Sequence, residues 1–384
     1  TAPLPDAASL LASARVVSVL PDGETLLLEM GGVPLLFDGE NIRAVGIDLT
    51  RCGRSEKTGY TMAMKLHEAI RSTDIGRAGY LWSPDGRYAL VANATAVLSR
   101  AKNTYGMTLL DARDGALYMA EPGGKTFADL GTIIQQACFD GESGLLFCVV
   151  SADKKTQLRS YNPSTAEWKS LCALEGSMAC EGMGWDSRGD LQFLMYYGGE
   201  IHRTTFSVET GALAQEILAN VGVPLYFAVT PACTLLESRI EDRPVQFCLV
   251  EGDARRVAVC AEDGAASAQL APAGDGQQSE TGLEAEPLDV LRAALSSDGR
   301  YALLVCTSGE RVYSAYRMDT STLALTSVDI SAFADDIAEK GAGFHCGNPL
   351  WQPGLCFTGG DRYILLPYLD GSTVLCELTE IETP

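Results

Sequence analysis

Positive charge and histidine are scarce in this sequence. It holds 29 Lys and Arg against 50 Asp and Glu, which gives a net charge of −21 at pH 7, and it has three histidines. Because the phosphates of nucleic acids and of anionic membranes would repel such a chain, we expect neither as a partner. Long apolar runs are missing too. None approaches the ~20 residues of a membrane-spanning helix, so no transmembrane segment is expected.

Motifs of the common catalytic classes are also missing. The chain has no G-x-S-x-G elbow, no Walker A loop and no dinucleotide-binding glycine fingerprint. His67, His202 and His345 do not stand in H-x-x-x-H spacing, and no C-x-x-C pair occurs, which disfavours a zinc site. The sequence therefore predicts no catalytic residue, no metal site and no cofactor.

What the sequence does contain is a repeated phrase. Residues 81–93 read LWSPDGRYALVAN, and residues 294–306 read ALSSDGRYALLVC. In both, Gly supplies the positive φ of a tight turn, and a nearly continuous apolar run follows, which is typical of a strand buried on both faces. Looser versions of this hairpin occur at 19–30, 138–150, 184–197, 227–240 and 356–368.

These hairpins recur at intervals of roughly 45–65 residues, which is the spacing of β-propeller blades. Two further short strands around a turn follow several of them, as in 106–120, 156–171 and 311–330. We therefore predict an all-β protein, a seven-bladed β-propeller with six or eight blades as alternatives. The whole chain, 1–384, is expected to form this single domain.

The stretch SPDGRYAL resembles the WD40-like repeat of TolB-type periplasmic propellers and of the propeller domains of prolyl-oligopeptidase relatives. The close match covers residues 82–91 and 296–304, and the matched residues are turn and packing positions. The resemblance implies a propeller and, because TolB-type relatives are mostly extracytoplasmic, an exported protein. Residues 1–13 would then be a linker that follows a cleaved signal peptide or an upstream lipid anchor.

Twelve cysteines leave the localisation open. Cys148, Cys248, Cys260, Cys306 and Cys376 stand in apolar strand-like runs, where a free thiol behaves as a small hydrophobic residue. A disulfide scaffold would be a shorter and denser chain, so we expect these thiols to be buried and reduced. A cytoplasmic protein would explain them as well as an exported one.

One insertion has the opposite charge to the rest of the chain. Residues 48–78 are expected to interrupt the blades with a helix, and they hold six basic and four acidic side chains. Four of the basic residues, Arg51, Arg54, Lys57 and Arg71, are candidate binding residues for an acidic partner. The alternative is that this segment docks on the protein's own acidic surface.

Three more features depart from the repeat. Residues 263–287 are rich in Ala, Gly, Gln and acids, which predicts a mobile acidic loop. Residues 331–341, SAFADDIAEKG, predict a short helix that Ser331 caps and Gly341 ends. Trp351 falls outside the repeat register, so we expect it to be exposed and count it as the fifth candidate binding residue.

The termini suggest how the propeller closes. The last unit ends one strand short, and residues 14–20, ARVVSVL, could supply its outer strand, which would remove two exposed sheet edges. The turn at Pro21 and Asp22 would then join two blades and would not close a hairpin.

Two functions are compatible with these features. The first is a non-catalytic, extracytoplasmic binding module, a monomer that presents its rim loops to a protein or polymer ligand. The alternative is an enzyme, a lyase or hydrolase, with its site at the mouth of the central channel, where the inner strands of a propeller converge.

Overall fold

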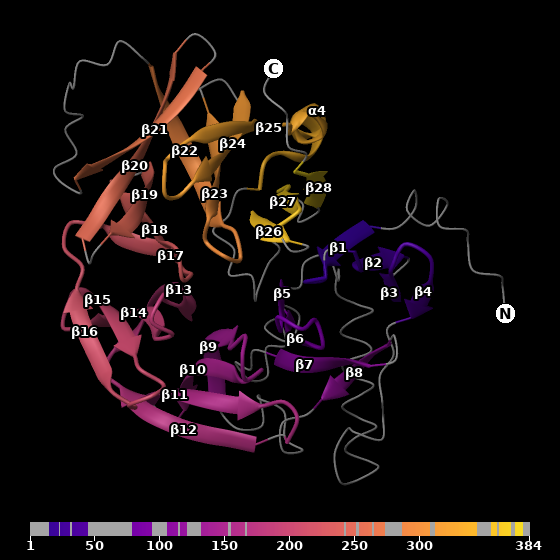
Figure 1. Ribbon diagram of the computed structural model, residues 1–384, viewed down its shortest axis with the longest axis vertical. Helices are drawn as coiled ribbons and strands as arrows, with labels where there is room; N and C mark the ends of the chain where they lie inside the picture. Colours follow the sequence, from indigo (N-terminus) through magenta and orange to yellow (C-terminus); the bar gives the residue numbers. More distant parts are fainter. Residues whose placement is uncertain are drawn as a thin grey trace. The chain divides into compact units, whose positions relative to one another are not determined.

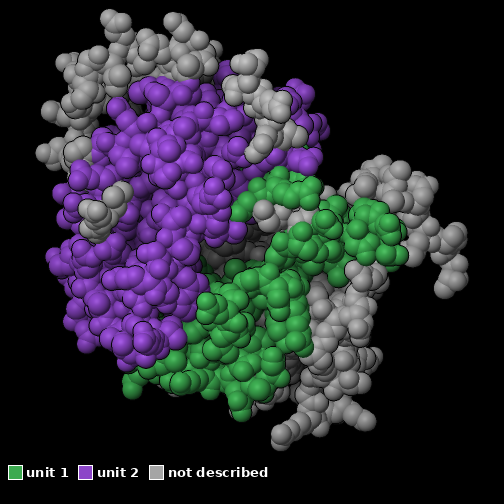
Figure 2. Space-filling model, viewed as in Figure 1, with its two compact units in different colours: residues 1–174, 347–354, 358–375 green, residues 175–346, 355–357, 376–384 purple. Residues whose placement is uncertain are grey.

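The computed structural model describes seven stretches of the chain, with short gaps inside them. The stretches are residues 15–44, 79–93, 106–120, 132–152, 155–272, 286–343 and 355–378, and the gaps fall at 23, 31–32, 114–115, 166, 242, 251–252, 263–264, 308–311, 359–360 and 370–372. Nearly all of the described elements are β-strands (Figure 1). Two compact units divide the chain (Figure 2): residues 1–174, 347–354 and 358–375, and residues 175–346, 355–357 and 376–384.

The first unit contains three four-stranded antiparallel sheets, and in each of them the strands lie in sequence order. The first sheet consists of β1 (Arg15–Val19), β2 (Leu26–Met30), β3 (Val33–Phe37) and β4 (Ile42–Ala44). The second consists of β5 (Gly79–Trp82), β6 (Tyr88–Asn93), β7 (Gly106–Arg113) and β8 (Ala116–Ala120). The third consists of β9 (Thr132–Phe139), β10 (Leu146–Ala152), β11 (Lys155–Asn162) and β12 (Glu167–Leu174).

The second unit repeats this plan. Its first sheet consists of β13 (Ser177–Trp185), β14 (Leu191–Tyr197), β15 (Glu200–Phe206) and β16 (Leu213–Ile217). The next consists of β17 (Val223–Val229), β18 (Thr234–Ile240), β19 (Arg243–Val250) and β20 (Asp253–Glu262), with β21 (Ala265–Pro272) paired to β20. The third consists of β22 (Glu286–Leu295), β23 (Tyr301–Thr307), β24 (Tyr313–Asp319) and β25 (Leu325–Val328).

Two pairings join these three sheets into one path. β13 pairs in parallel with β17, and β20 pairs with β22. Nearer the C-terminus, a sheet of three strands consists of β26 (Cys356–Thr358), β27 (Tyr363–Pro367) and β28 (Thr373–Glu377). Four antiparallel strands in sequence order are the topology of a propeller blade. The expected all-β propeller is thus confirmed, whereas the number of blades and the single domain remain predictions.

The repeated phrase forms the same turn twice. Ser83 accepts a hydrogen bond at Oγ from the N–H of Tyr88 (2.9 Å) and donates its hydroxyl to Asp85. In the second copy, Ser296 Oγ accepts from the N–H of Tyr301 (3.0 Å) and donates to Asp298 (2.9 Å). The serine therefore closes the turn from inside, which explains why the phrase recurs with so little change.

The second strand of a blade forms much of its core. Leu191 to Met195 of β14 and Ala302 to Cys306 of β23 are buried at every position. Both faces of these strands are therefore covered, which is why the corresponding sequence runs are continuously apolar and do not alternate.

The strand cysteines lie in strands, as the sequence predicted. Cys148 and Cys306 are fully buried, Cys248 and Cys376 are buried, and Cys260 is partly exposed. Burial, with a contribution from the nearby charge of Asp289, raises the pKa of Cys306 to about 12. Since a thiol is nucleophilic only as the thiolate, such cysteines act as packing groups. Their redox state remains a prediction.

The expected helix is present, but Ser331 does not cap it. Helix α4 spans Ser331–Lys340, its N-cap is Ile330, and no side chain makes a capping hydrogen bond. Asp329, one residue further out, accepts the N–H of Ser331 (2.9 Å). The predicted end is confirmed, because Gly341 has a φ of 71° and its N–H donates to the carbonyl of Ile337.

The predicted closure by residues 14–20 is wrong. β1 pairs with β2 at the edge of its own sheet, and the three strands β26 to β28 do not include it. The reason is the intervening turn. Asp22 Oδ1 accepts the N–H groups of Glu24 and Thr25, and the N–H of Leu20 donates to the carbonyl of Thr25 (2.8 Å). These bonds make a tight hairpin, and the hairpin returns the chain into the same sheet.

The predicted loop at 263–287 is partly a strand. Residues 265–272 form β21, which pairs with β20 from Glu262↔Ala265 to Arg255↔Pro272. This strand forms despite its low hydrophobicity because β20 supplies a complete backbone ladder, and Leu270 packs against the core beside it. Residues 273–285 lie outside the described part of the chain, as do residues 1–13 and 48–78.

Candidate functional site

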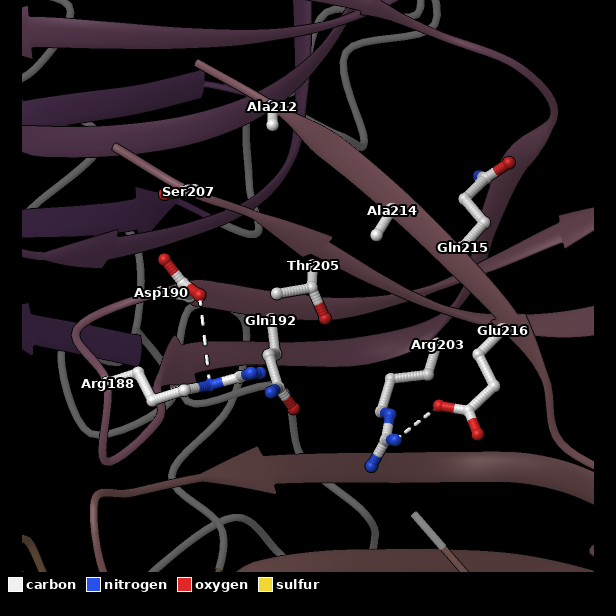
Figure 3. A pocket seen from close by; sticks show the side chains of 10 residues that line it. All are labelled: Arg188, Asp190, Gln192, Arg203, Thr205, Ser207, Ala212, Ala214, Gln215 and Glu216. Atoms are coloured by element: carbon white, nitrogen blue, oxygen red, sulfur yellow. Dashed lines mark hydrogen bonds and ion pairs between the residues drawn. The ribbon is translucent and has the colours of Figure 1, made fainter. Parts of the chain in front are cut away.

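A polar pocket of about 290 Å³ opens on the sheet β13–β16 of the second unit (Figure 3). Its lining comes from the turn between β13 and β14, from β14 and β15, from the turn between β15 and β16, and from β16. The lining residues are Arg188, Asp190, Gln192, Arg203, Thr205, Ser207, Ala212, Ala214, Gln215 and Glu216.

The turn at one end of the pocket is organised by Asp186. Its Oδ1 accepts the N–H of Arg188 (2.9 Å) and that of Asp190 (3.0 Å). Its Oδ2 accepts the side-chain amide of Gln192 (2.8 Å) and lies 3.3 Å from the guanidinium of Arg188. One carboxylate therefore fixes the turn with one oxygen and positions two lining side chains with the other.

Asp186 is held in its charged form. Partial burial would raise the pKa of its carboxyl group, but the hydrogen bonds from the backbone N–H groups of Asp190 and Arg188 and from the side chains of Gln192 and Arg188 lower it below its ordinary value. At neutral pH the carboxylate is therefore a permanent negative group behind the pocket.

Gln192 has one hydrogen-bonding group without a partner among the described residues. The residue is 6% exposed, and its amide N–H₂ is oriented toward Asp186. Its Oε1 is closed to solvent and accepts no hydrogen bond from the described part of the chain. A buried acceptor left unpaired costs about 1–3 kcal/mol, so a donor that reached this oxygen after a rotation of the Gln192 side chain would be stabilising.

A cross-strand ion pair forms the other end of the pocket. Arg203 on β15 stands opposite Glu216 on β16, and its guanidinium contacts the carboxylate. The Arg203 side chain is mostly covered, whereas that of Glu216 is 55% exposed. Arg188 is the most accessible cation of the pocket, with 72% of its side chain exposed.

Strand register explains why these residues meet. Gln192 lies opposite Thr205 on β15, and Thr205 lies opposite Ala214 on β16. Because side chains alternate between the two faces of a sheet, Gln192, Arg203, Thr205, Ala214 and Glu216 share one face. That face offers donors and acceptors of both charge signs, which suits a ligand with polar groups of both kinds.

The pocket contains no paired nucleophile and base. His202 is adjacent to Arg203 and so lies on the other face of β15, where its Nε2 is 3.9 Å from a carboxylate oxygen of Glu200. Among the described residues, no group of three or more His, Cys, Asp or Glu side chains is placed to hold a metal ion. The arrangement supports recognition better than it supports covalent chemistry.

None of the five candidate residues from the sequence can be placed. Arg51, Arg54, Lys57, Arg71 and Trp351 lie outside the described residues. The pocket residues were missed, although one signal pointed to them. The looser hairpin at 184–197 has Asp-Ser-Arg-Gly-Asp where the repeat has a Ser-x-Asp-Gly turn.

Comparison with known proteins gives distant likenesses in structure. No family model matches the chain, and no curated protein matches it. Similar solved structures include TolB from Acinetobacter baumannii (14% identity, TM-score 0.40, 98% of this chain and 83% of that one). They also include the β-propeller domain of Cps50 (Swd1) from Myceliophthora thermophila (13%, 0.48, 96% and 97%) and a periplasmic gluconolactonase from Pseudomonas aeruginosa (10%, 0.47, 95% and 96%).

These structures include TolB and WD40 β-propeller domains, which supports the resemblance of the repeat to the WD40-like repeat of TolB-type propellers. At such identities and TM-scores the likeness carries no argument about function. In addition, no helix among the described residues is long and apolar enough to cross a membrane.

Proposed function

We propose that the chain is a non-catalytic, extracytoplasmic binding propeller that holds a polar segment of a protein partner in the pocket of sheet β13–β16. One observation carries the proposal: the pocket lining combines an accessible guanidinium, an accessible carboxylate and a buried acceptor that has no partner among the described residues. These groups are Arg188, Glu216 and Gln192 Oε1. The extracytoplasmic setting is supported by the resemblance of the repeat to TolB-type propellers.

A peptide segment is the favoured ligand because it brings both donors and acceptors along its length. The pocket holds two arginines and two acids, so its charge is balanced and does not select a strongly charged polymer. It has no aromatic side chain in its lining on which a sugar ring could stack. Among the described residues, no specific observation favours the alternative of a lyase or hydrolase at the channel mouth.

Site-specific photo-cross-linking tests the proposal. A benzophenone amino acid replaces Ala212, an exposed lining residue directly before β16. Ala324 is a matched control, since its carbonyl accepts the N–H of Asp319 just as the carbonyl of Ala212 accepts that of Ser207 (both 2.9 Å). We expect a discrete protein adduct from position 212 in extracts of the native host and none from position 324.

Competition then links the adduct to the pocket. An excess of unlabelled wild-type protein should abolish it, whereas the Arg188→Ser/Glu216→Gln variant should not, because the two altered side chains are exposed and the fold is retained. Equal adducts at both positions, or full competition by the variant, would exclude this pocket as the binding site.

A further inference from the structure

Strand β16 is an uncovered edge. It lies at the end of its sheet in the strand order of the described chain, and all five of its residues, Leu213–Ile217, are exposed. Its sequence, LAQEI, has no Lys and no Pro, which normally protect an edge strand from pairing with another chain, and Glu216 is its single charged residue.

The backbone groups of β16 that point outward can be identified. The N–H of Ser207 donates to the carbonyl of Ala212, and the N–H of Leu218 donates to that of Ile201, so residues 212 and 218 bond inward to the β15 side. In an antiparallel ladder the inward and outward residues alternate. The N–H and C=O groups of Leu213, Gln215 and Ile217 therefore face away from the sheet.

The backbone groups of these three residues can pair with the same three residues of a second copy of the chain. Antiparallel pairing about a two-fold axis at Gln215 places Leu213 opposite Ile217 of the second copy, and Gln215 opposite Gln215. Each of these pairs joins two outward-facing residues, so each can exchange two backbone hydrogen bonds. A contact in which one patch meets itself is closed and isologous, and it makes a dimer and not a filament.

The side chains match as well. Leu213 and Ile217 are 37% and 52% exposed, and across the axis each would pack on the other as an apolar cross-strand pair. Next to Ile217 on the same face, His202 of β15 makes an edge contact with the ring of Tyr197, which is 46% exposed. The apolar surface that begins at Leu213 and Ile217 therefore continues inward from the edge to the ring of Tyr197.

Another outer strand lacks these properties. β12 lies at the edge of its sheet, and it carries Glu167 and Lys169 as exposed charges. Its large residue Trp168 packs inward on Tyr161, with ring centroids 4.9 Å apart. β12 thus carries two exposed charges, whereas β16 carries one, Glu216, and its three outward-paired residues Leu213, Gln215 and Ile217 are uncharged.

We propose that β16 pairs with β16 of a second copy, so that the chain forms a two-fold dimer through a continuous sheet. This replaces the monomer that the sequence led us to expect. The dimer is a separate proposal, because the pocket side chains Arg203, Thr205 and Glu216 lie on the opposite face of the sheet from the apolar pair Leu213 and Ile217. Gln215 is the lining residue that stands on the axis.

Hydrogen exchange of the wild-type protein tests the pairing directly. The outward amides of Leu213, Gln215 and Ile217 have no partner strand in a monomer and should exchange rapidly in dilute solution. At high concentration they should become protected at least about tenfold, while the inward amides of Ala214 and Glu216 are protected at both concentrations. Exchange of the three outward amides that does not depend on concentration would overturn the proposal.

Light scattering with two proline variants gives a second test. The wild type should approach twice the monomer mass of 40.9 kDa as its concentration rises. Ile217→Pro removes an outward N–H and no bond to β15, and Ile217 does not line the pocket, so this variant should stay monomeric and folded. Ser327→Pro changes an outward-facing residue of the outer strand β25 and should still dimerise. A monomeric wild type, or a dimeric Ile217→Pro variant, would refute the dimer.

The proposed pocket and the proposed dimer can be refuted independently of each other. Arg188→Ser changes the pocket but lies off β16, so it should lose the cross-linked partner and keep the dimer mass. Ile217→Pro should lose the dimer and keep the cross-link from position 212. Loss of both properties in either variant would show that the edge and the pocket form one site, and it would overturn the independent dimer proposed above.

Discussion

Two turns of the molecule occupy equivalent places in their sheets and are built differently. In the turn before β23, a serine hydroxyl closes the turn, because Ser296 Oγ accepts the N–H of Tyr301 and donates to Asp298. In the turn before β14, Asp186 stands in the place of that serine and accepts two backbone N–H groups with one oxygen. Its other oxygen binds Gln192 and Arg188.

The difference shows how a repeated unit acquires a site. The serine hydroxyl is fully used within its own turn and leaves nothing for neighbouring residues. A carboxylate has two oxygens and a charge, so it can close the turn and also orient side chains on the next strand. The sheet β13–β16, in which Asp186 replaces the serine in this way, carries the pocket.

The largest expected effect concerns the turn glycines. Gly299 has a φ of 72°, and a Cβ built there would lie 1.7 Å from Thr230 Oγ1, which hydrogen bonds hold to Cys233. Gly189, in the Asp186 turn, has a φ of 76° and nothing within 4 Å. Gly299→Ala should lower the free energy of unfolding by about 2–5 kcal/mol, the sum of backbone strain and overpacking, and Gly189→Ala by about 1–2 kcal/mol.

Urea denaturation of both variants measures this difference. Equal losses of stability would mean that the close approach at Gly299 is absent in solution. A larger loss for Gly189→Ala would reverse the comparison of the two turns.

The next effect concerns the residues that close the two turns. Asp186→Ala removes several charge-assisted hydrogen bonds and should lower the free energy of unfolding by about 2 kcal/mol, whereas Ser296→Ala should lower it by about 1 kcal/mol. Ser187→Ala, an exposed neighbour of Asp186, is the control and should change little. Urea midpoints at neutral pH rank the three variants. A loss from Asp186→Ala no larger than that from Ser187→Ala would contradict the assigned hydrogen bonds.

Lowering the pH should change the stability contributed by the two turns differently. The pKa of Asp186 is lowered in the folded state, so its stabilising contribution is present above the unfolded pKa, about 3.9, and is lost as the pH falls through the lower folded value. The stability difference between wild type and Asp186→Asn should therefore shrink below about pH 4. Ser296 does not titrate, so the difference between wild type and Ser296→Ala should stay constant. Parallel pH profiles of thermal unfolding would disprove the shift at Asp186.

The smallest effect on stability concerns the ion pair of the pocket. Arg203 and Glu216 form a partly exposed pair, and such pairs contribute at most about 1 kcal/mol. In a double-mutant cycle of Arg203→Met and Glu216→Gln, the coupling energy should fall in that range and weaken with added salt. A coupling energy several times larger would show that the pair holds the sheet together, so its role would be structural.

The sequence predicted those parts of the fold that depend on local chemistry. The turn residues Ser83 and Ser296 and the apolar runs of β14 and β23 are legible because each acts over a few residues. The errors at Ser331 and at 265–272 arose where a neighbouring residue or strand supplied the bonds instead. The misplaced pairing of residues 14–20 shows the limit most clearly, because strand partners far apart in the chain leave no local signal.

The pocket could not be predicted for a related reason. It needs Gln192, Arg203 and Glu216 on one face, and only the register of β14, β15 and β16 brings them together. The substitution of aspartate for the serine of the repeat was visible in the sequence. Its consequence, a second carboxylate oxygen directed at Gln192, appears only in the folded sheet.

The central claim is that the sheet with the altered turn, and not the sheet with the close repeat, holds the ligand. The most direct test is the cross-linking yield from Ala212 relative to Ala324, measured in the wild type and in an Asp186→Ser background. We predict a wild-type yield at 212 about tenfold above that at 324, the ratio expected for roughly 1.4 kcal/mol of specific binding, and its loss in Asp186→Ser. Equal yields at the two positions, or a yield at 212 that Asp186→Ser leaves unchanged, would contradict the account.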